Sequence, residues 1–465
     1  MHYAIGLAVG EVPVNGRRKP TTRSSRDWVK GAISLIAVGV AIVVPQSAHS
    51  QTLDQELLHQ APRVLHYLNE RGWRNVGVLK FRVQKGNERI SDRAGPLNLN
   101  LATRLEIALV LADDVRKPVN IIRDASAVAA RLPGANHLSP SGREALFRGR
   151  YPLAWGDQQV EADAFLTGVA IVSSDLRQVQ VAILGFGPNN PKMENVAEFT
   201  ASTDPPVLVD VGESFMIRGA FEGGRVKIVP ETVIKTAAKV KQGEETHPLL
   251  DPSAPVGLEI FYDNRSVPLE IREGKAWVRE PQEGQKVLLV LRKRDKTVDR
   301  YGVVLMVNGQ NTLFKERIPP VDCTKWILSE DYPAITVRGF QTRQKTAEAF
   351  RILSSQESKA NTMHYGADVG TISLVVFREL KSLRTSPSLP DDDAEDLAAV
   401  FRSRLPEKQP LNLAALKYQL RSGSGSNATR GLIVEGPKID AADRILTYTP
   451  DPTPVLAGTI TYYRP

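Results

Sequence analysis

The fold is decided first by a short apolar run, NVGVLKF at residues 75–81, which has the length and composition of a buried strand. An amphipathic helix is predicted ahead of it, over residues 53–71. Thr52 and Gln55 give the start of that helix the form of a capping box. A second helix is predicted over residues 97–111, where leucine and alanine recur at helical spacing.

Further strands follow along the chain. Residues 119–122 predict a strand, and residues 124–132 a short helix that Asp124 could cap. Residues 164–172 and 178–186 predict two strands of a hairpin. This order of strands and helices predicts an α/β domain on a mixed sheet over residues 51–200.

Three motifs in this region resemble a known family. They are NVGVLKF at 75–81, LNLNLATRL at 97–105 and ADAFLTGV at 162–169. Together they resemble the periplasmic α/β module shared by the TolB amino-terminal domain and the CsgG-like and FlgO-like envelope proteins. The resemblance implies an envelope protein.

Residues 201–255 lose clear periodicity and contain Pro205-Pro206 and Gly223-Gly224. We interpret them as a linker and extended segment, with residues 207–217 extended and residues 235–256 flexible.

A β-rich region follows over residues 256–381. Eight short runs rich in β-forming residues are spaced about ten residues apart, which predicts an antiparallel β-sandwich. The runs are 258–262, 267–271, 275–279, 287–292, 303–307, 334–338, 350–353 and 371–377. The predicted fold class is therefore a multidomain α+β protein, an α/β mixed-sheet module followed by an antiparallel β-sandwich.

This region also resembles a known group of domains through three ordered motifs. They are VNGQNT at 307–312, RGFQ at 338–341 and GTISLVVFRE at 370–379. They resemble an uncharacterised β-sandwich domain of secreted bacterial proteins, which implies a fold and a compartment but no reaction.

The end of the chain, residues 382–465, is interpreted as a linker and a polar tail with a terminal strand. Asp391, Asp392 and Asp393 close the linker, and the run SGSGS at 422–426 is typical of flexible chain. Residues 458–463 alternate and predict a strand added to the sandwich.

The start of the chain predicts export. Residues 1–50 carry six basic side chains, the apolar run 31–45 and the triplet Ala48-His49-Ser50, the order found in a signal peptide. A spanning helix needs about 20 apolar residues, so cleavage is favoured over a retained amino-terminal anchor. Membrane contact is expected only if this segment is retained.

The charge of the chain, +8 over 465 residues, initially suggests nucleic acid. The leader accounts for half of it, because residues 51–465 hold 54 basic and 50 acidic side chains, a net +4. Basic residues are not clustered with aromatics in the manner of nucleic-acid binders. We therefore expect no nucleic-acid partner.

The search for catalytic or metal-binding patterns returns none. His59 and His66 are seven residues apart without a third ligand, and no HExxH motif is present. We expect surface or structural roles for these two and a solvated side chain for His137 in its loop. Cys323 follows Asp322, whose charge disfavours a reactive thiolate, so we expect an idle or packed thiol. No cofactor, metal or catalytic residue is predicted.

The leading hypothesis is an exported, periplasmic or extracellular, non-enzymatic envelope protein that acts as an interaction or assembly scaffold. Its partners would be envelope proteins or cell-wall components. The alternative is a ligand-binding module whose β-sandwich recognises cell-wall glycan or polysaccharide through an aromatic platform of Trp277, Trp326 and Phe340. A third hypothesis is a hydrolase with two dispersed carboxylates that converge in a cleft.

Overall fold

The structure is a computed structural model. The residues that it describes are 51–188, 190–218, 229–297, 299–343, 346–352, 370–380, 401, 405, 409–421, 438–440 and 447–462. Ser50–Pro465 form one compact unit. The predicted leader at 1–50, the aspartates of the predicted linker and the run at 422–426 lie outside the described residues.

The amino-terminal module, residues 51–202, contains a six-stranded mixed sheet of order β3-β1-β6-β7-β8, with β2 also paired to β6. Its strands are β1 Asn75–Val78, β2 Arg82–Lys85, β3 Asn120–Ile122, β6 Ala164–Val172, β7 Gln178–Gly187 and β8 Asn190–Ser202. β1 runs parallel to both β3 and β6, whereas β6, β7 and β8 are successively antiparallel. The mixed sheet and the β6–β7 hairpin confirm the prediction, but β2 and β8 were not foreseen.

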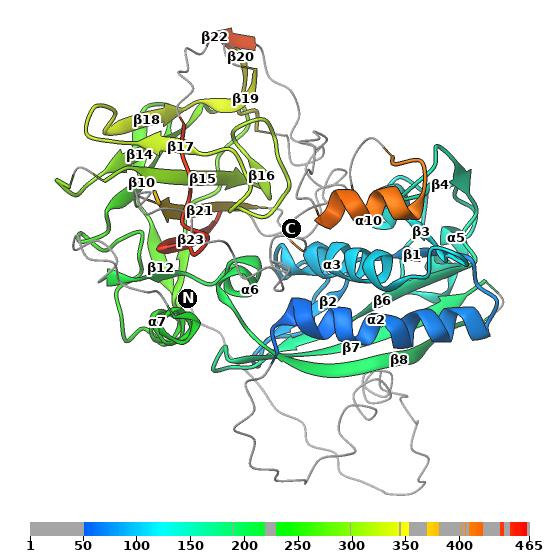
Figure 1. The fold of residues 1–465 in the computed structure, drawn as a ribbon. Helices are drawn as coiled ribbons and strands as arrows, with labels where there is room; N and C mark the ends of the chain where they lie inside the picture. Colours follow the sequence, from blue (N-terminus) through cyan, green and yellow to red (C-terminus); the bar gives the residue numbers. More distant parts are fainter. Residues whose placement is uncertain are drawn as a thin grey trace, which may run out of the picture. The chain divides into compact units, whose positions relative to one another are not determined.

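Helices cover both faces of this sheet. They are α2 Leu53–Glu70, α3 Leu97–Ala112, α4 Ala125–Ala129 and α5 Pro140–Leu146. The predicted capping box at the start of α2 is present. The predicted cap of the helix at 124–132 is absent, because Asp124 makes no side-chain cap hydrogen bond, and α4 ends at Ala129. α2 and α3 lie side by side (Figure 1) and share the main apolar core with the sheet. Side chains from α4 and α5, with the short strands β4 Tyr151–Pro152 and β5 Gln159–Val160 nearby, form a second apolar cluster against Phe165 and Phe186.

The connection between the modules differs from the predicted linker. It contains α6 Pro205–Asp210, β9 Phe215–Met216 and α7 Pro230–Gln242. Pro205 occupies the first turn of α6, where its fixed φ favours a helix, and Asp204 caps that turn through Val207 N. The double proline therefore starts a helix here rather than extending the chain. α7 buries one apolar face into the core, so residues 235–242 are helical rather than flexible.

The β-rich module is built mainly on two sheets, of order β11-β10-β14-β18 and β12-β13-β23-β21-β15-β16. β17 pairs with β15 and β9 with β23, and a further small sheet has the order β19-β20-β22. The bounds are β10 Val256–Tyr262, β11 Arg265–Val267, β12 Glu270–Arg272, β13 Lys275–Trp277, β14 Val287–Lys293, β15 Tyr301–Val307, β16 Gln310–Asn311, β17 Trp326–Leu328, β18 Ala334–Val337, β19 Gly339–Arg343, β20 Thr346–Ala349, β21 Thr371–Arg378, β22 Lys438–Asp440 and β23 Leu456–Thr461.

Most predicted strands of this region are present, and the α+β class is confirmed. Three details differ. β20 ends at Ala349, so residues 350–352 are not a strand, and β13 runs parallel to β23. The predicted strand 267–271 is divided between β11 and β12, which belong to different sheets. Inward side chains of both large sheets, such as Leu289 and Leu305, belong to the main core. The face-to-face sandwich remains a prediction.

The tail contains one helix that the sequence analysis did not identify, α10 Leu413–Arg421. Leu413, Leu416 and Leu420 are buried along one side of it. α10 lies beside α3 (Figure 1), and Lys417 Nζ donates to Asp113 O. The terminal strand predicted after it is present as β23.

Candidate functional site

The three aromatic residues of the predicted ligand platform are not brought together. Phe340 is 1% exposed and packs edge-on against Phe350, with 5.2 Å between ring centroids. Trp277 and Trp326 are half-buried on β13 and β17, and three strands, β23, β21 and β15, separate β13 from β17 in the sheet. Because strands lie about 4.8 Å apart, these residues do not form one continuous platform.

For three of the four residues that were predicted to have no catalytic or metal-binding role, the predicted exposure or burial agrees with the structure. His59 and His66 lie exposed on α2, and Cys323 is buried with its thiol near Ile318 O at 3.3 Å, as predicted. His137 was predicted to be solvated, but it is only 5% exposed. His137 lies in the segment that leads from α4 to α5, and its side chain is buried there rather than exposed to solvent.

The best-defined polar site begins where β1 stops. Both β1 and β2 pair with β6 in parallel, Val78 opposite Leu166 and Arg82 opposite Val169. Three residues lie between Val78 and Arg82, but only two lie between their partners Leu166 and Val169 on β6. This extra residue breaks the strand in the manner of a β-bulge, a feature that re-aims a side chain. The re-aimed residue is Lys80.

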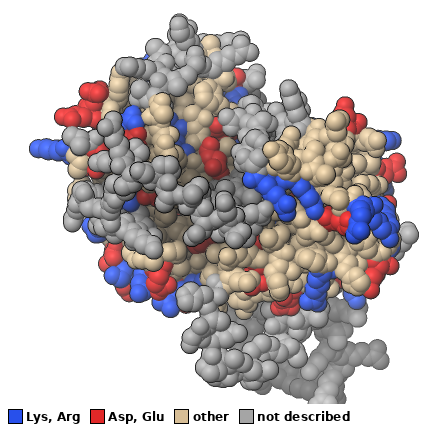
Figure 2. All heavy atoms as spheres, in the orientation of Figure 1, with Lys and Arg blue, Asp and Glu red and all other residues tan. Residues whose placement is uncertain are grey.

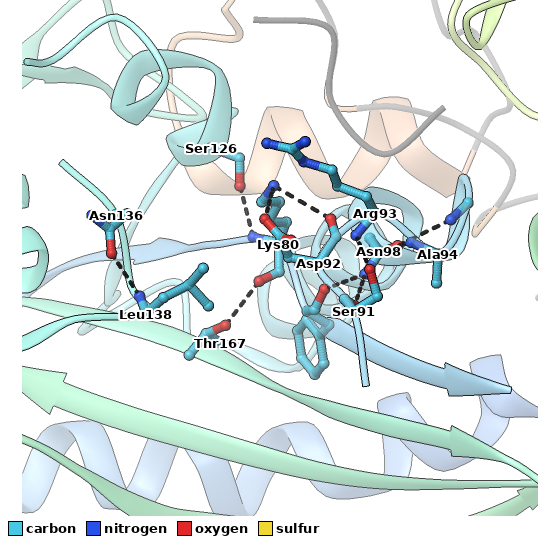
Figure 3. Close-up of polar contacts among 12 residues, drawn as sticks. Lys80, Ser91, Asp92, Arg93, Ala94, Asn98, Ser126, Asn136, Leu138 and Thr167 are labelled. Carbon is cyan, nitrogen blue, oxygen red and sulfur yellow. Dashed lines mark hydrogen bonds and ion pairs between the residues drawn. The ribbon is translucent and has the colours of Figure 1, made fainter. Parts of the chain in front are cut away.

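Lys80 is held by every polar group that it carries (Figure 3). Its backbone N donates to Ser126 Oγ at 2.7 Å, and Thr167 Oγ1 donates to its carbonyl at 2.9 Å. Its ammonium donates to Asp92 Oδ2 at 2.8 Å and to Asp92 O at 3.3 Å. The three anchors come from α4, β6 and the loop before α3, so they fix the strand break from three directions.

Asn98 at the start of α3 holds the loop that carries Asp92. Its side-chain amide is fully buried and donates to Phe81 O and Ser91 O at 2.7 and 3.0 Å. Its carbonyl oxygen accepts from Ala94 N and Gly95 N at 2.7 and 3.1 Å. One side chain thus ties the loop to the broken strand on both sides.

Cationic groups gather around His137. Lys80, Arg82 and Arg143 lie close enough to lower the pKa of its imidazole, while Asp92 opposes them. Burial is the largest cause, and the combined result is a pKa of about 4, so the ring is neutral at pH 7. Arg143 donates to His137 O at 2.9 Å. We call these five residues the His137 cluster.

Asp92 is the acidic member of the His137 cluster. Its burial opposes ionisation, but the hydrogen bond and charge of Lys80, assisted by Arg93, keep the pKa of the carboxyl below its usual range. Lys80 and Asp92 are each about a quarter exposed, at 25% and 27% of the side chain. Asp92 is therefore an anion at neutral pH, and it neutralises one of three cations.

A second charged group lies between α2, α3 and α6. Arg104 donates to Asp54 Oδ1 at 2.6 Å and to Asp210 Oδ2 at 3.1 Å, and Asn100 donates to Asp210 Oδ1 at 2.9 Å. Burial raises the pKa of nearby Asp204 to about 6, although Arg104 opposes this. We call Arg104, Asp54, Asp204 and Asp210 the Arg104 cluster. Its guanidinium and carboxylates bind one another, so its arrangement is that of a structural tie.

Charges elsewhere are mixed. Lys and Arg side chains and Asp and Glu side chains both occur on the face shown in Figure 2. Within the described ranges, no group of three or more His, Cys, Asp or Glu side chains has the arrangement of a metal site. No helix among those same ranges is both long and apolar enough to cross a bilayer.

Comparisons with known proteins yield little. No family model matches the sequence, and no curated protein matches it. One solved structure with similarity is the LpoB C-terminal domain from Salmonella enterica, at 10% identity, a TM-score of 0.21, and coverage of 31% of this chain and 93% of that one. Another is E. coli LpoB, at 12% identity, a TM-score of 0.21, and coverage of 42% and 82%. At this TM-score the similarity identifies neither a family nor a function.

Proposed function

We propose that this chain is an exported envelope protein that acts as a non-enzymatic interaction or assembly scaffold. The predicted leader at residues 1–50 supplies the compartment, either the periplasm or the exterior of the cell. The partners would be envelope proteins or cell-wall components. The resemblances to the TolB, CsgG and FlgO module and to the secreted β-sandwich domain are part of the same proposal.

The observation that carries the proposal is a continuous apolar core. Val76 on β1, Phe215 on β9 and Leu305 on β15 all belong to it, although they come from the amino-terminal module, the connection and the β-rich module. Independent domains move relative to one another unless their shared interface is large and apolar. A shared core lets one protein hold two binding surfaces together, which is what a scaffold requires.

The tail forms a second connection between the amino-terminal module and the β-rich module. α10 packs beside α3, and Gln409 Nε2 donates to Leu153 O at 2.9 Å in the amino-terminal module. The chain then enters the β-rich module, where β23 pairs with β21 and with β13. The tail therefore contacts both modules before it ends.

Cross-linking in intact cells tests this proposal. A tagged full-length chain should fractionate with the envelope and be cross-linked to a defined partner, and the tagged partner should recover the chain in the reciprocal experiment. A chain found in the cytoplasmic fraction, or one cross-linked to no partner that captures it in return, would contradict the scaffold.

Glycan recognition is the second candidate, and the partial exposure of Trp277 and Trp326 is what favours it. Co-sedimentation with purified sacculi tests it. Binding that falls in both Trp277→Ala and Trp326→Ala, but not in the tail variant Tyr418→Ala, would support the glycan. Tyr418 is a suitable control because its side chain is exposed on α10. Equal co-sedimentation of all three variants would contradict it.

A further inference from the structure

We propose that the His137 cluster is a binding site for a phosphate group, with Lys80, Arg82 and Arg143 as the cations that receive its oxygens. The site lies at the carboxyl end of β1, between the parallel neighbours β3 and β6. In open α/β sheets, ligands bind outside the carboxyl ends of the strands, at the point where successive connections leave in opposite directions.

The connections of this sheet have that arrangement. From β1 the chain passes through β2 and α3 to β3, and α3 packs in the main core on one face. From β3 it passes through α4 and α5 to β6 on the other side of β1, and these helices pack in the second cluster on the opposite face. The break between β1 and β2 therefore lies at the switch point of the sheet.

The charge of the cluster suits a divalent anion. Three cations face a single carboxylate, that of Asp92, which leaves a formal charge of +2 around a neutral imidazole. Arg93 adds a further positive charge beside Asp92, where Figure 3 places the two residues together. A phosphate monoester or free phosphate carries up to two negative charges at neutral pH, and arginine binds phosphate oxygens through paired N–H donors.

Two members of the cluster are available to a ligand. Within the described part of the chain, the Arg82 guanidinium makes no hydrogen bond or ion pair, although it is partly buried and burial lowers its pKa. The Nε2 atom of His137 likewise has no hydrogen-bond partner there, at 5% exposure of the residue. A buried polar atom without a partner is destabilising, and a phosphate oxygen would supply the partner.

His247 shows why the cations matter to this inference. It is as deeply buried as His137, and its Nε2 also lacks a partner among the described residues. Only burial acts on the pKa of its imidazole. An unpartnered imidazole alone is therefore not evidence of a site, and the surrounding cations distinguish His137.

The members of the cluster differ in exposure. Lys80, Arg82 and Arg143 are each partly exposed, whereas His137 is buried. Lys80 and the loop of Asp92 are already held in place by Ser126, Thr167 and Asn98 (Figure 3), so a ligand would not have to order them. Such preorganisation lowers the entropic cost of binding.

Isothermal titration calorimetry of the purified protein with inorganic phosphate tests the proposal. We expect saturable binding in wild type and a loss of about tenfold or more in affinity in Arg82→Gln, because one charge-assisted contact is removed. Arg116→Gln is the matched control, since Arg116 is an exposed arginine of the same module that pairs with Asp114 outside the cluster. Its affinity should equal that of wild type.

Two further titrations distinguish a phosphomonoester from free phosphate and exclude a non-specific effect of ionic strength. Glycerol 3-phosphate should bind more tightly than inorganic phosphate if the natural ligand is a phosphomonoester, and less tightly if it is free phosphate. Sodium chloride at equal ionic strength should give no saturable heat. Absence of phosphate binding up to about 10 mM, or equal affinity in wild type and a folded Arg82→Gln variant, would overturn the proposal.

Discussion

The Arg104 cluster and the His137 cluster both place charged side chains inside the amino-terminal module, but the balance of charge is opposite. Around Arg104, three carboxylates share one guanidinium, which donates to two of them directly. Around His137, three cations share one carboxylate. Within the described ranges, Arg82 makes no hydrogen bond or ion pair and His137 Nε2 has no hydrogen-bond partner. The charges of the Arg104 cluster are paired with one another within the chain. In the proposal, the excess positive charge of the His137 cluster is paired with an external anion.

The largest effect on stability is expected from breaking the Arg104 cluster. Arg104→Leu leaves buried Asp210 and half-buried Asp54 and Asp204 without their cation. Removing one partner of a buried pair costs about 3–5 kcal/mol of unfolding free energy. Urea denaturation measures this loss. Arg104→Lys keeps the charge but loses the paired N–H donors of the guanidinium. Its unfolding free energy should lie between that of wild type and that of Arg104→Leu.

Exposed Arg116 supplies the control for that measurement. Arg116→Leu should leave the urea midpoint unchanged, because its pairing with Asp114 is at the surface. A midpoint for Arg104→Leu that equals that of Arg116→Leu would show that the Arg104 cluster is not a structural tie.

The next largest effect is expected at Asn98, which supports the His137 cluster. Asn98→Ala removes the side-chain partner of Phe81 O and of two backbone N–H groups, and one of the two donors to Ser91 O. We expect a loss of about 2–3 kcal/mol of unfolding free energy. Because the same loop carries Asp92, phosphate affinity should fall as well. A variant that is destabilised but keeps full phosphate affinity would separate the loop from the site.

The two clusters also differ in how their carboxyl groups make stability depend on pH, because the pKa of Asp204 is raised and that of Asp92 is lowered. Burial raises the pKa of Asp204 to about 6, with Arg104 opposing it and Asp54 adding to it, whereas aspartate titrates near 3.9 in an unfolded chain. The folded protein therefore holds this proton more tightly, and the contribution of Asp204 to the free energy of unfolding falls as pH rises from about 4 to about 6.

Asp204→Asn should remove that dependence while retaining an oxygen to cap Val207 N. Between pH 4 and pH 6.5, we expect the variant to gain about 2 kcal/mol relative to wild type. The comparison with wild type cancels the carboxyls whose pKa values are lowered, such as Asp92, which act in the opposite direction. Parallel pH profiles for the two proteins would contradict the assignment.

The smallest effect is expected at Thr167. Thr167→Val keeps the shape of the side chain but removes its hydrogen bond to Lys80 O, for a loss of about 1 kcal/mol. Thermal unfolding measures the change. Wild-type stability in this variant would mean that the broken strand does not depend on its anchor from β6.

The sequence predicts those elements whose signals are local. The capping box at Thr52 and the nearly continuous apolar run at residues 164–172 predict α2 and β6 well, because each signal depends on neighbouring residues. β8 was missed because two register irregularities in its pairing with β7 break the period of two. α10 was missed although Leu413, Leu416 and Leu420 stand at helical spacing.

The polar clusters could be predicted only in part. Lys80 within NVGVLKF and Arg104 within the mostly apolar helix α3 are charges in apolar surroundings, a signal that each must find a buried or partly buried partner. The identity of those partners depends on contacts between residues far apart in the sequence, such as Arg104 with Asp210. His137 could not be recognised, because its loop of proline, glycine and serine is typical of exposed chain.

The most direct test of the contrast between the clusters is NMR of the protein with ¹⁵N-labelled histidine rings, titrated with inorganic phosphate. His137→Gln identifies the resonances of His137, and His247 serves as the internal reference because it is buried without cations around it. We predict a saturable shift of the His137 Nε2 resonance with no change at His247. An unchanged His137 resonance, or equal shifts at both residues, would contradict the account.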